Sequence, residues 1–559
     1  MSNGAFLLPW LDQHPQGDFW LTAGLILLAF GLAAAPLLRN RTESSQSHDW
    51  GWGLLLLAIL IAGRWPTFLV PRQFNVDESQ LLAGAHALVH DPVFWRSVNG
   101  GTAGPLDFFT LWPAAWLCGG ANYLAARLTA CALLALSLTL AHQCLALRFG
   151  RSIARIASLG AVGLEALTNA QDLLHYSTEL LPVALLAGAA YAAVRRWGAS
   201  GGPIWNGPGG LLLGAVPLGK LQALPLAGIM GLGWLWAEIR AKEPQPGRRI
   251  ARLLSGALAP AALFALQLTV AGEWRSFYNS YLLYNLNYAS GGSSALGPLL
   301  AAMWQNSILW DSLLPVWGTG LLIWLALMLR PRPVPGRAAR IFTWTAFAAF
   351  LISLASIVGP GRPFLHYWQL LVVPATLLLG AMTANLLATS PAHSRATERW
   401  LVVLCAGGLT GSMLFHRANH PNPAFGHLAY FQKNPRTKLA ATVAAHARAG
   451  EQIAIWGWSS YLYVETGLRQ ATRDGHCGAL VEAGPLQDYF RRRYLADLEN
   501  SRPATFVDST GPASMGQADA QYAHDRNFPE LAALIRAGYV QVAEAEGARI
   551  YRRKNLVAP

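Results

Sequence analysis

Long apolar stretches recur along the chain and limit its folds more than any other feature. Segments of about 18 or more mostly apolar residues are long enough to cross roughly 30 Å of hydrocarbon as helices. Such segments follow one another between residues 19 and 415 of a sequence of 559 residues. Only 13% of the residues are charged, which is about half the share typical of soluble domains. The sequence therefore predicts an α-helical polytopic membrane protein.

Twelve spans are expected, and the first is interpreted as a retained span because it lacks a charged leader and a small-residue cleavage site. Arginine and lysine cluster in alternate loops, which marks those loops as cytoplasmic and places both termini outside. The same loops hold most of the net charge of +13, which favours orientation by positive loops over nucleic-acid binding. The expected spans are 19–37, 51–69, 122–146, 153–168, 179–194, 208–218, 222–238, 251–271, 312–329, 341–358, 366–388 and 400–415.

Two regions are expected to depart from plain spans. The segment 208–218 is too short to cross untilted, so we expect a broken or re-entrant helix, paired with 222–238. The first large outer loop is expected to form interfacial helices at 79–89 and 106–117, with tryptophans such as Trp95 at the depth of the lipid headgroups.

The composition changes after about residue 416, where helical and strand-like segments begin to alternate. This alternation predicts a soluble α/β domain with a small, mostly parallel sheet, closed by a hairpin that turns at Glu546-Gly547. Three parts are expected: an extra N-terminal span with a cytoplasmic loop (1–50), a transmembrane domain (51–415) and an outer domain (416–559). The five cysteines show no paired spacing, so the sequence predicts neither a disulfide framework nor a zinc site.

An isolated acidic pair, Asp77-Glu78, follows the second apolar stretch at the mouth of the expected bundle. A carboxylate in this position can deprotonate a hydroxyl nucleophile or hold a divalent cation through its oxygens. The alternative is a solvated helix cap. Ionisable residues at the mouth of a helical bundle nevertheless favour a functional role.

A second polar cluster lies between two spans on the same outer side. On a helix, Asp172, His175 and Glu179 share one face because they are spaced i, i+3 and i+7. They then form an acidic patch able to hold a metal, unless the segment is an interfacial helix with its wet face outward. Further along, Lys220 is the only lysine before residue 242. It either snorkels toward headgroups or binds an anion, for which a phosphate suits its compact charge.

The last outer cluster contains Arg362, His366 and Tyr367. Arg362 offers a planar fork of donors that suits a phosphate, and the other two residues add donors nearby. An aromatic belt with one anchoring arginine is the alternative. The loop 272–311 mixes aromatic and amide side chains, which suit sugar rings and membrane interfaces alike.

In their order and sidedness these clusters resemble the C-type (GT-C) superfamily of polytopic membrane glycosyltransferases, specifically bacterial relatives of protein O-mannosyltransferases and lipid A sugar transferases. The resemblance covers roughly residues 50–415. The family's acidic pair matches Asp77-Glu78, and the acid that opens the helix after the second outer loop matches Glu179. The other matches are the proline-leucine-aromatic stretch at Asp107, the turn with Lys220 and Gln222, and the stretch with Arg362, Phe364, His366, Tyr367 and Pro374.

The resemblance implies a GT-C-like bundle that transfers a sugar, with inversion, from a polyprenyl-phosphate donor to a hydroxyl of a lipid, glycan or protein. The reaction is then expected at the outer face of a bacterial cytoplasmic membrane. Asp77 is expected to act as the general base, while Glu78, Glu179 and Asp172 are expected to position the acceptor or hold one metal ion, which is allowed but not required. The residues expected to bind substrate or neutralise the departing phosphate are Lys220, Gln222, Arg362, His366, Tyr367, Asp107 and His175.

Two other functions fit the same composition. A transporter or flippase for a lipid-linked or anionic substrate would show repeated halves and a midplane site, whereas no repeat is found and the charged groups cluster at the outer rim. An oligosaccharide ligase or polymerase would favour an arginine-rich outer loop and no acidic pair after the second span. None of these motifs identifies the sugar, the acceptor or the lipid chain length.

Overall fold

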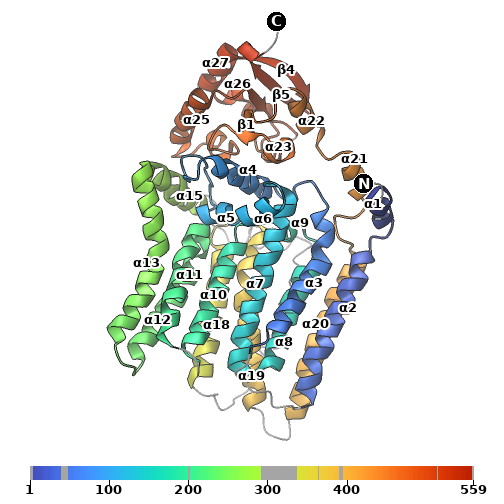
Figure 1. Cartoon of the computed structure of the whole chain (residues 1–559), viewed down its shortest axis with the longest axis vertical. Coiled ribbons are helices and arrows are strands. Elements are labelled where there is room, and N and C mark those ends of the chain that lie inside the picture. The colour runs from blue at the N-terminus through green and yellow to red at the C-terminus, as the bar shows by residue number, and fades with distance from the viewer. Residues whose placement is uncertain are drawn as a thin grey trace.

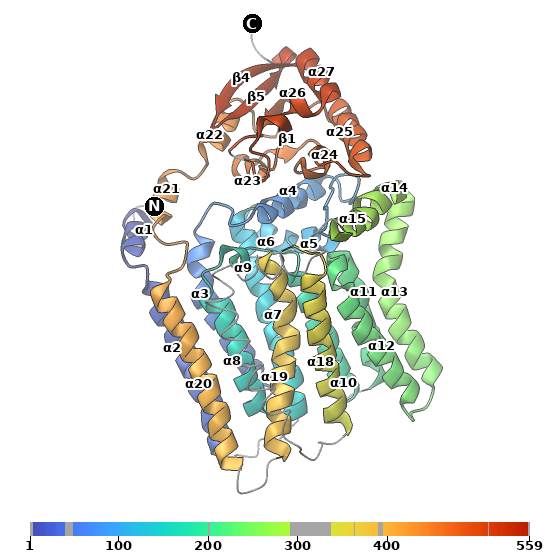
Figure 2. The same ribbon diagram turned by 180° about the vertical axis from the view of Figure 1, so that it is seen from behind.

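A bundle of long helices carries an α/β unit on one of its ends (Figures 1 and 2). The structure is a computed structural model that describes residues 4–39, 48–198, 202–290, 337–362, 364–389, 395–512 and 514–556. We call the end that carries the α/β unit the outer end. The helices of the bundle are α2 (Gly17–Leu38), α3 (Trp50–Phe68), α7 (Tyr123–Phe149), α8 (Arg151–Leu167), α10 (Leu180–Arg196), α11 (Asn206–Gly219), α12 (Leu224–Arg240), α13 (Pro246–Ala271), α18 (Arg337–Val358), α19 (Gln369–Thr389) and α20 (Arg395–Asn419).

Eleven of the twelve expected spans coincide with these helices, and the twelfth, 312–329, lies outside the described residues. Seven of the described helices are long and apolar enough to cross a membrane. The protein is therefore a multi-pass membrane protein, although the count of twelve is not confirmed. The helices α8, α10, α11 and α12 are shorter, with 17, 17, 14 and 17 residues.

The segments 208–218 and 222–238 form two helices that are joined by a turn at the outer end. α11 ends at Gly219 and α12 begins at Leu224, with a 3₁₀ turn, η2 (Leu221–Ala223), between them. At 1.5 Å per residue, the 14 residues of α11 extend only about 21 Å. Lys220 directly follows α11 and lies at the outer end, where it forms an isolated antiparallel bridge with Ala103.

A layer of short helices covers the outer end beneath the α/β unit (Figure 1). Its first helix begins at Asn75, whose side chain accepts from the Asp77 N–H at 2.9 Å. The expected helix at 106–117 is interrupted after Phe109, before Pro113. Trp95 is buried and packs against Phe277 with ring centroids 4.9 Å apart, so its expected place among headgroups is wrong. The layer consists of α4 (Val76–His90), α5 (Pro105–Phe109), α6 (Trp112–Leu117), α9 (Gln171–Leu174), α14 (Trp274–Phe277), the π-helix η3 (Tyr278–Leu283), α15 (Tyr284–Ser290) and the 3₁₀ helix η5 (Leu365–Trp368).

The α/β unit contains a five-stranded sheet with the order β2-β1-β3-β5-β4. The β1–β2 and β1–β3 pairs are parallel, whereas β3–β5 and β4–β5 are antiparallel. The expected parallel pairing is present for β1, β2 and β3, whereas the hairpin docks antiparallel on β3 and makes the sheet mixed. The hairpin turns at Glu546-Gly547 as expected, with φ values of 51° and 80° that suit a tight hairpin turn. The strands are β1 (Gln452–Trp456), β2 (Arg469–Gln470), β3 (Thr505–Asp508), β4 (Tyr539–Ala545) and β5 (Ala548–Arg553).

Helices cover both faces of this sheet and complete the unit (Figure 2). The described helices of the unit and of the segments that join it to the bundle are α1 (Gly4–Gln13), α21 (Leu428–Lys433), α22 (Lys438–Ala445), α23 (Tyr461–Thr466), α24 (Gly478–Val481), α25 (Gln487–Ser501), η6 (Ala520–Tyr522), α26 (His524–Asn527), α27 (Pro529–Gly538) and η7 (Lys554–Leu556).

Glycine allows α11 and α13 to pack closely. A Cβ on Gly214 would lie 1.9 Å from the carbonyl oxygen of Ala257, and one on Gly210 would lie 2.1 Å from that of Leu253. The two glycines are four residues apart on one face of α11, as in the small-residue motifs that bring membrane helices together. This contact therefore depends on the absence of side chains.

We expect Gly214→Leu to separate α11 from α13 and lower the free energy of unfolding by about 1–3 kcal/mol, because overpacking forces the backbones apart. Thermal unfolding of the purified protein in detergent checks this. Gly228→Leu is the matched control, since a Cβ there meets no atom within 4 Å. Equal melting temperatures for the two variants would contradict the close contact.

Candidate active site at the outer end

Three outer loops meet at the carboxylate of Asp172, in α9. It accepts a hydrogen bond from Asn75 Nδ2 at 2.6 Å and one from the backbone N–H of His366 at 2.9 Å. His366 Nδ1 lies 3.0 Å from both carboxylate oxygens. Burial alone would raise the pKa of Asp172, but the contact with His366 holds it well below its usual range. The three residues come from the first, second and last outer loops, so Asp172 fixes these loops to one another.

Lys220 and Glu179 form a buried ion pair next to this junction. Lys220 Nζ donates to the Glu179 carboxylate and to Thr178 Oγ1, the latter at 2.6 Å. Burial alone would raise the pKa of Glu179, but the Lys220 ammonium lowers it below its usual value. Since the Glu179 carboxylate already binds a cation of the chain, its expected role as a metal ligand is not favoured.

Asp107 lies at the same place with an unpaired carboxyl group. Its side chain is fully buried, and neither carboxyl oxygen has a partner among the described residues. A Cβ on Gly219 would lie 3.6 Å from Oδ1, which places Asp107 against the turn that carries Lys220. Burial holds the pKa of Asp107 well above its usual range. A carboxylic acid kept protonated in this way can donate a hydrogen bond.

Two tyrosines connect the expected cations. Lys220 Nζ lies 4.8 Å from the ring centroid of Tyr367, whose hydroxyl is 3.3 Å from that of Tyr288, in α15. Arg362 Cζ lies 4.9 Å from the centroid of the Tyr288 ring. Arg362 Nε is buried and has no partner among the described residues. Lys220 and Arg362, which are 142 positions apart in the sequence, therefore lie at the two ends of one tyrosine pair.

Asp77 lies within electrostatic reach of the same tyrosines. It lies in the first turn of α4, half-buried, and its carboxylate forms no hydrogen bond or ion pair with any residue that the structure describes. Burial raises the pKa of Tyr288; the Asp77 carboxylate acts in the same direction, whereas Tyr367, Lys220 and Arg362 act against it. Both cations and the expected base therefore influence Tyr288 electrostatically.

Glu78 points elsewhere, because adjacent residues on a helix project about 100° apart. Its carboxylate is fully buried and accepts from Arg127 Nε at 3.2 Å and Arg127 Nη2 at 3.1 Å. Arg127 also donates to the carbonyl oxygens of Thr67 and Val70 at 2.6 Å. Glu78 therefore ties α4 to α3 and α7, and this engagement does not favour its expected catalytic and metal-binding roles.

Among the remaining expected site residues, some lie near Asp172 and Lys220 and others are held elsewhere. Gln222 Nε2 donates to the Ser356 carbonyl at 2.7 Å and thereby joins η2 to α18, away from the open groups. The expected common face of Asp172, His175 and Glu179 does not form, because α9 ends at Leu174 and His175 is extended. Glu179 binds Lys220 instead.

His175 nevertheless reaches the site from its extended segment. Its side chain is 1% exposed, and neither ring nitrogen has a partner among the described residues. The ring meets that of His366 edge-on, with centroids 5.8 Å apart. One ligand atom each from Asp172, His175 and His366 lies within 4.8 Å of the others, so these three residues could hold a metal ion.

The α/β unit forms a roof that the sequence did not indicate. His476 stacks on Trp458 with ring centroids 4.4 Å apart and planes 11° apart. The adjacent Gly475 packs on α4, since a Cβ there would lie 3.8 Å from Gln80 Cγ, one helical turn after Asp77. A stacked aromatic pair therefore lies beside the Asp77 end of α4. No local sequence signal distinguishes these two residues from ordinary turn residues.

Comparison with solved structures places this arrangement in a known fold. ArnT from Cupriavidus metallidurans bound to undecaprenyl phosphate superimposes with a TM-score of 0.56 at 15% identity, covering 91% of this chain and 99% of that one. Its apo state gives 0.54 at the same identity and coverage. An oligosaccharyltransferase from Archaeoglobus fulgidus gives 0.41 at 11% identity, covering 82% and 69%. No protein-family model matches the sequence, and a search of curated proteins finds no match either. The expected GT-C-like fold with a C-terminal α/β unit is confirmed.

The adjacent acids give a direct test of this geometry. We expect Glu78→Gln to lower the free energy of unfolding by on the order of 3–5 kcal/mol, since it leaves the buried Arg127 charge without its partner. Asp77→Asn, the matched control one residue away, is expected to change it by less than about 0.5 kcal/mol, because its carboxylate has no partner to lose. Thermal unfolding in detergent measures both. A Glu78→Gln protein as stable as the Asp77→Asn protein would remove the structural role of Glu78.

Proposed function

We propose that this protein is a glycosyltransferase that moves a sugar from a polyprenyl-phosphate donor to an acceptor hydroxyl, with Asp77 as the base. The observation that carries the proposal is the contact of Lys220 with Tyr367 and of Arg362 with Tyr288, two tyrosines whose hydroxyls lie 3.3 Å apart and within electrostatic reach of Asp77. A base and two cations around one space are what the transfer of a group away from a phosphate requires. The similarity of fold to ArnT, whose structure contains undecaprenyl phosphate, supports the same reading.

Arg362 is proposed as the main contact of the donor phosphate. Its unpaired buried Nε belongs to a planar fork of donors that matches phosphate oxygens. Lys220 is held by Glu179 and Thr178, so its position is fixed in advance and it contributes charge without having to rearrange. His366, oriented by Asp172, is the third proposed donor to the phosphate.

The proposed reaction is a single displacement with inversion. Asp77 takes the proton of the acceptor hydroxyl as that oxygen bonds to the anomeric carbon, and the bond from this carbon to the phosphate oxygen breaks. The bonding electrons stay on the phosphate, where Arg362 and Lys220 stabilise the growing charge. Asp107, whose pKa is raised by burial and whose carboxyl oxygens have no partner among the described residues, is proposed as a further polar contact of the substrate beside Lys220.

A divalent cation fits the site formed by Asp172, His175 and His366, because His175 offers two buried ring nitrogens without partners. This set replaces Glu78 and Glu179 as the proposed ligands. When bound, such an ion would supply Lewis-acid stabilisation of the departing phosphate. Asp172 would then both bind the ion and orient His366.

The roof formed by Trp458 and His476 is proposed to contact the acceptor. Aromatic faces beside a carboxylate suit the apolar face of a sugar ring or another flat group. His476 Nδ1 accepts from the Gly478 N–H at 3.1 Å, which leaves Nε2 free to donate. The α/β unit is therefore proposed to recognise the acceptor and to leave bond formation to the bundle.

We expect Asp77→Asn to reduce sugar transfer by about 10²-fold or more, because an amide cannot take the proton. Binding of undecaprenyl phosphate, a probe of the leaving group that does not depend on the sugar, should remain unchanged. Arg362→Gln should instead weaken that binding about 10- to 100-fold, as for the loss of a charge-assisted contact. Transfer is followed by mass analysis of glycans and polyprenyl-phosphate sugars in cells that carry each variant. Unaltered transfer by Asp77→Asn would overturn the proposal for the base.

The site is proposed to lie on the periplasmic side of the bacterial cytoplasmic membrane. Exposed basic residues gather at the other end of the bundle, around Lys242 and Arg248, as expected for the cytoplasmic side. A cysteine at exposed Ser290 should therefore react with an impermeant thiol reagent in intact spheroplasts, whereas one at exposed Gln245 should react only after lysis. The background variant lacks the half-buried Cys118 and Cys405. The opposite labelling pattern would invert the topology.

A further inference from the structure

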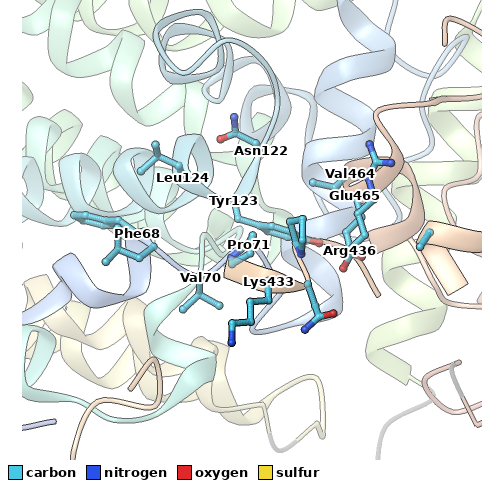
Figure 3. A pocket seen from close by; sticks show the side chains of 14 residues that line it. Phe68, Val70, Pro71, Asn122, Tyr123, Leu124, Lys433, Arg436, Val464 and Glu465 are labelled. Atoms are coloured by element: carbon cyan, nitrogen blue, oxygen red, sulfur yellow. The ribbon is translucent and has the colours of Figure 1, made fainter. Parts of the chain in front are cut away.

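A cavity of about 670 Å³ lies outside the site described above, where the α/β unit meets the bundle. Its floor is formed where α3 ends and α7 begins, and its other walls come from the segment between α21 and α22 and from α23 (Figure 3). The residues that line it are Phe68, Leu69, Val70, Pro71, Asn122, Tyr123, Leu124, Lys433, Asn434, Pro435, Arg436, Ala441, Val464 and Glu465.

The apolar floor continues onto the outside of the bundle. Leu69 is 43% exposed and Leu124 is 38% exposed. Leu128, one turn further along α7 on the same face, is 37% exposed. Since α3 and α7 are both apolar enough to span a membrane, this exposed strip faces lipid tails at the point where the membrane ends. An acyl or isoprenoid chain could therefore run along α7 and enter the cavity.

The wall above this floor carries positive charge that the described residues do not neutralise. Lys433 and Arg436 are exposed and form no ion pair or side-chain hydrogen bond with any described residue. The acid in the lining, Glu465, is already engaged, because it lies 3.3 Å from Arg72 Nη1 and accepts from the Thr437 N–H at 2.6 Å. The cavity thus combines an apolar floor with two free cations.

We propose that this cavity binds a membrane lipid with an anionic phosphate headgroup, drawn from the outer leaflet. The tail would lie against Leu124 and Leu128, and the phosphate would meet Lys433 and Arg436, which suit a phosphate as a point charge and as a planar fork of donors. The apolar floor favours a lipid over a free anion, since a free phosphate would leave that floor exposed to water.

This lipid site is separate from the donor site. Tyr123 forms its back wall, with its hydroxyl 2.9 Å from Ser79 Oγ and its ring 5.4 Å from Arg127 Cζ. The Glu78–Arg127 pair therefore lies behind that wall. The bound lipid would contact both the bundle, at Leu124, and the segment that leads into the α/β unit, at Arg436, and would hold the two together. The choice of the outer leaflet rests on the sidedness proposed above, whereas the lipid site itself does not depend on the proposed reaction.

The test uses the full-length protein in detergent and counts bound lipids by native mass spectrometry. Phosphatidylglycerol, phosphatidylcholine, undecaprenyl phosphate and inorganic phosphate are the probes. We expect one saturable phosphatidylglycerol site that the double substitution Lys433→Glu with Arg436→Glu weakens at least 10-fold. The charge-matched control, Arg448→Glu with Arg492→Glu, changes two exposed arginines elsewhere on the α/β unit and should bind normally.

A second variant covers the case in which the double substitution impairs folding. Leu124→Trp keeps every charge and fills the floor, and it should also weaken phosphatidylglycerol binding while undecaprenyl phosphate still binds at Arg362. The proposal would be overturned if phosphatidylcholine bound as tightly as phosphatidylglycerol and the double substitution did not weaken that binding. Lys433 and Arg436 would then contact headgroups without specificity for anionic lipids. Inorganic phosphate binding as tightly as phosphatidylglycerol would overturn it in favour of a free-anion site.

Discussion

The carboxylate of Asp172 is the constraint on which the geometry of the proposed active site depends. It joins Asn75, which caps α4, to the backbone and ring of His366, and so holds three loops that the sequence keeps far apart. The cap at Asn75 sets where α4 begins and therefore where Asp77 lies. The contact with His366 sets the turn from which Tyr367 reaches Lys220. If Asp172 moved, the proposed base Asp77 and the cations Lys220 and Arg362 would no longer keep their positions relative to one another.

Most buried charges in the described bundle have partners, and Asp107 at the candidate site is an exception. Arg64 binds Glu165 at 2.7 Å between α3 and α8, and Arg417 binds Asp18 between α20 and α2. Such pairs stabilise one arrangement chiefly because breaking either would leave an isolated charge. Asp77 and Arg362, which both lie near the outer end, form no such ion pair with any described residue. Groups left open where the rest of the structure pairs its charges are better explained by a substrate than by stability.

The sequence predicts much of this arrangement, because the apolar length of a span is a local property and the positive loops fix sidedness. These two signals predict that Asp107, Lys220, Arg362 and His366 lie at the same end of the bundle. They could not separate Asp77 from Glu78, since the difference lies in Arg127, 49 positions away. Arg127 itself carried a usable signal, because a charge inside an apolar stretch needs a partner. The predicted common face of Asp172, His175 and Glu179 does not form, and the reason is tertiary. Asp172 contacts His366 whereas Glu179 contacts Lys220, and the helix that contains Asp172 ends before His175.

The contacts between the α/β unit and the bundle argue for a fixed roof rather than a lid. Asp474 accepts from Asn99 at 2.6 Å and from Arg493 at 2.6 Å, and Arg493 also donates to Ser280 in η3. Ala83 of α4 belongs to the hydrophobic core of the α/β unit. Opening the roof would break buried charged hydrogen bonds and expose that core at the same time, which costs more than loop motions in a lid usually do. In the proposed reaction, an acceptor would therefore have to reach Asp77 without lifting of the roof.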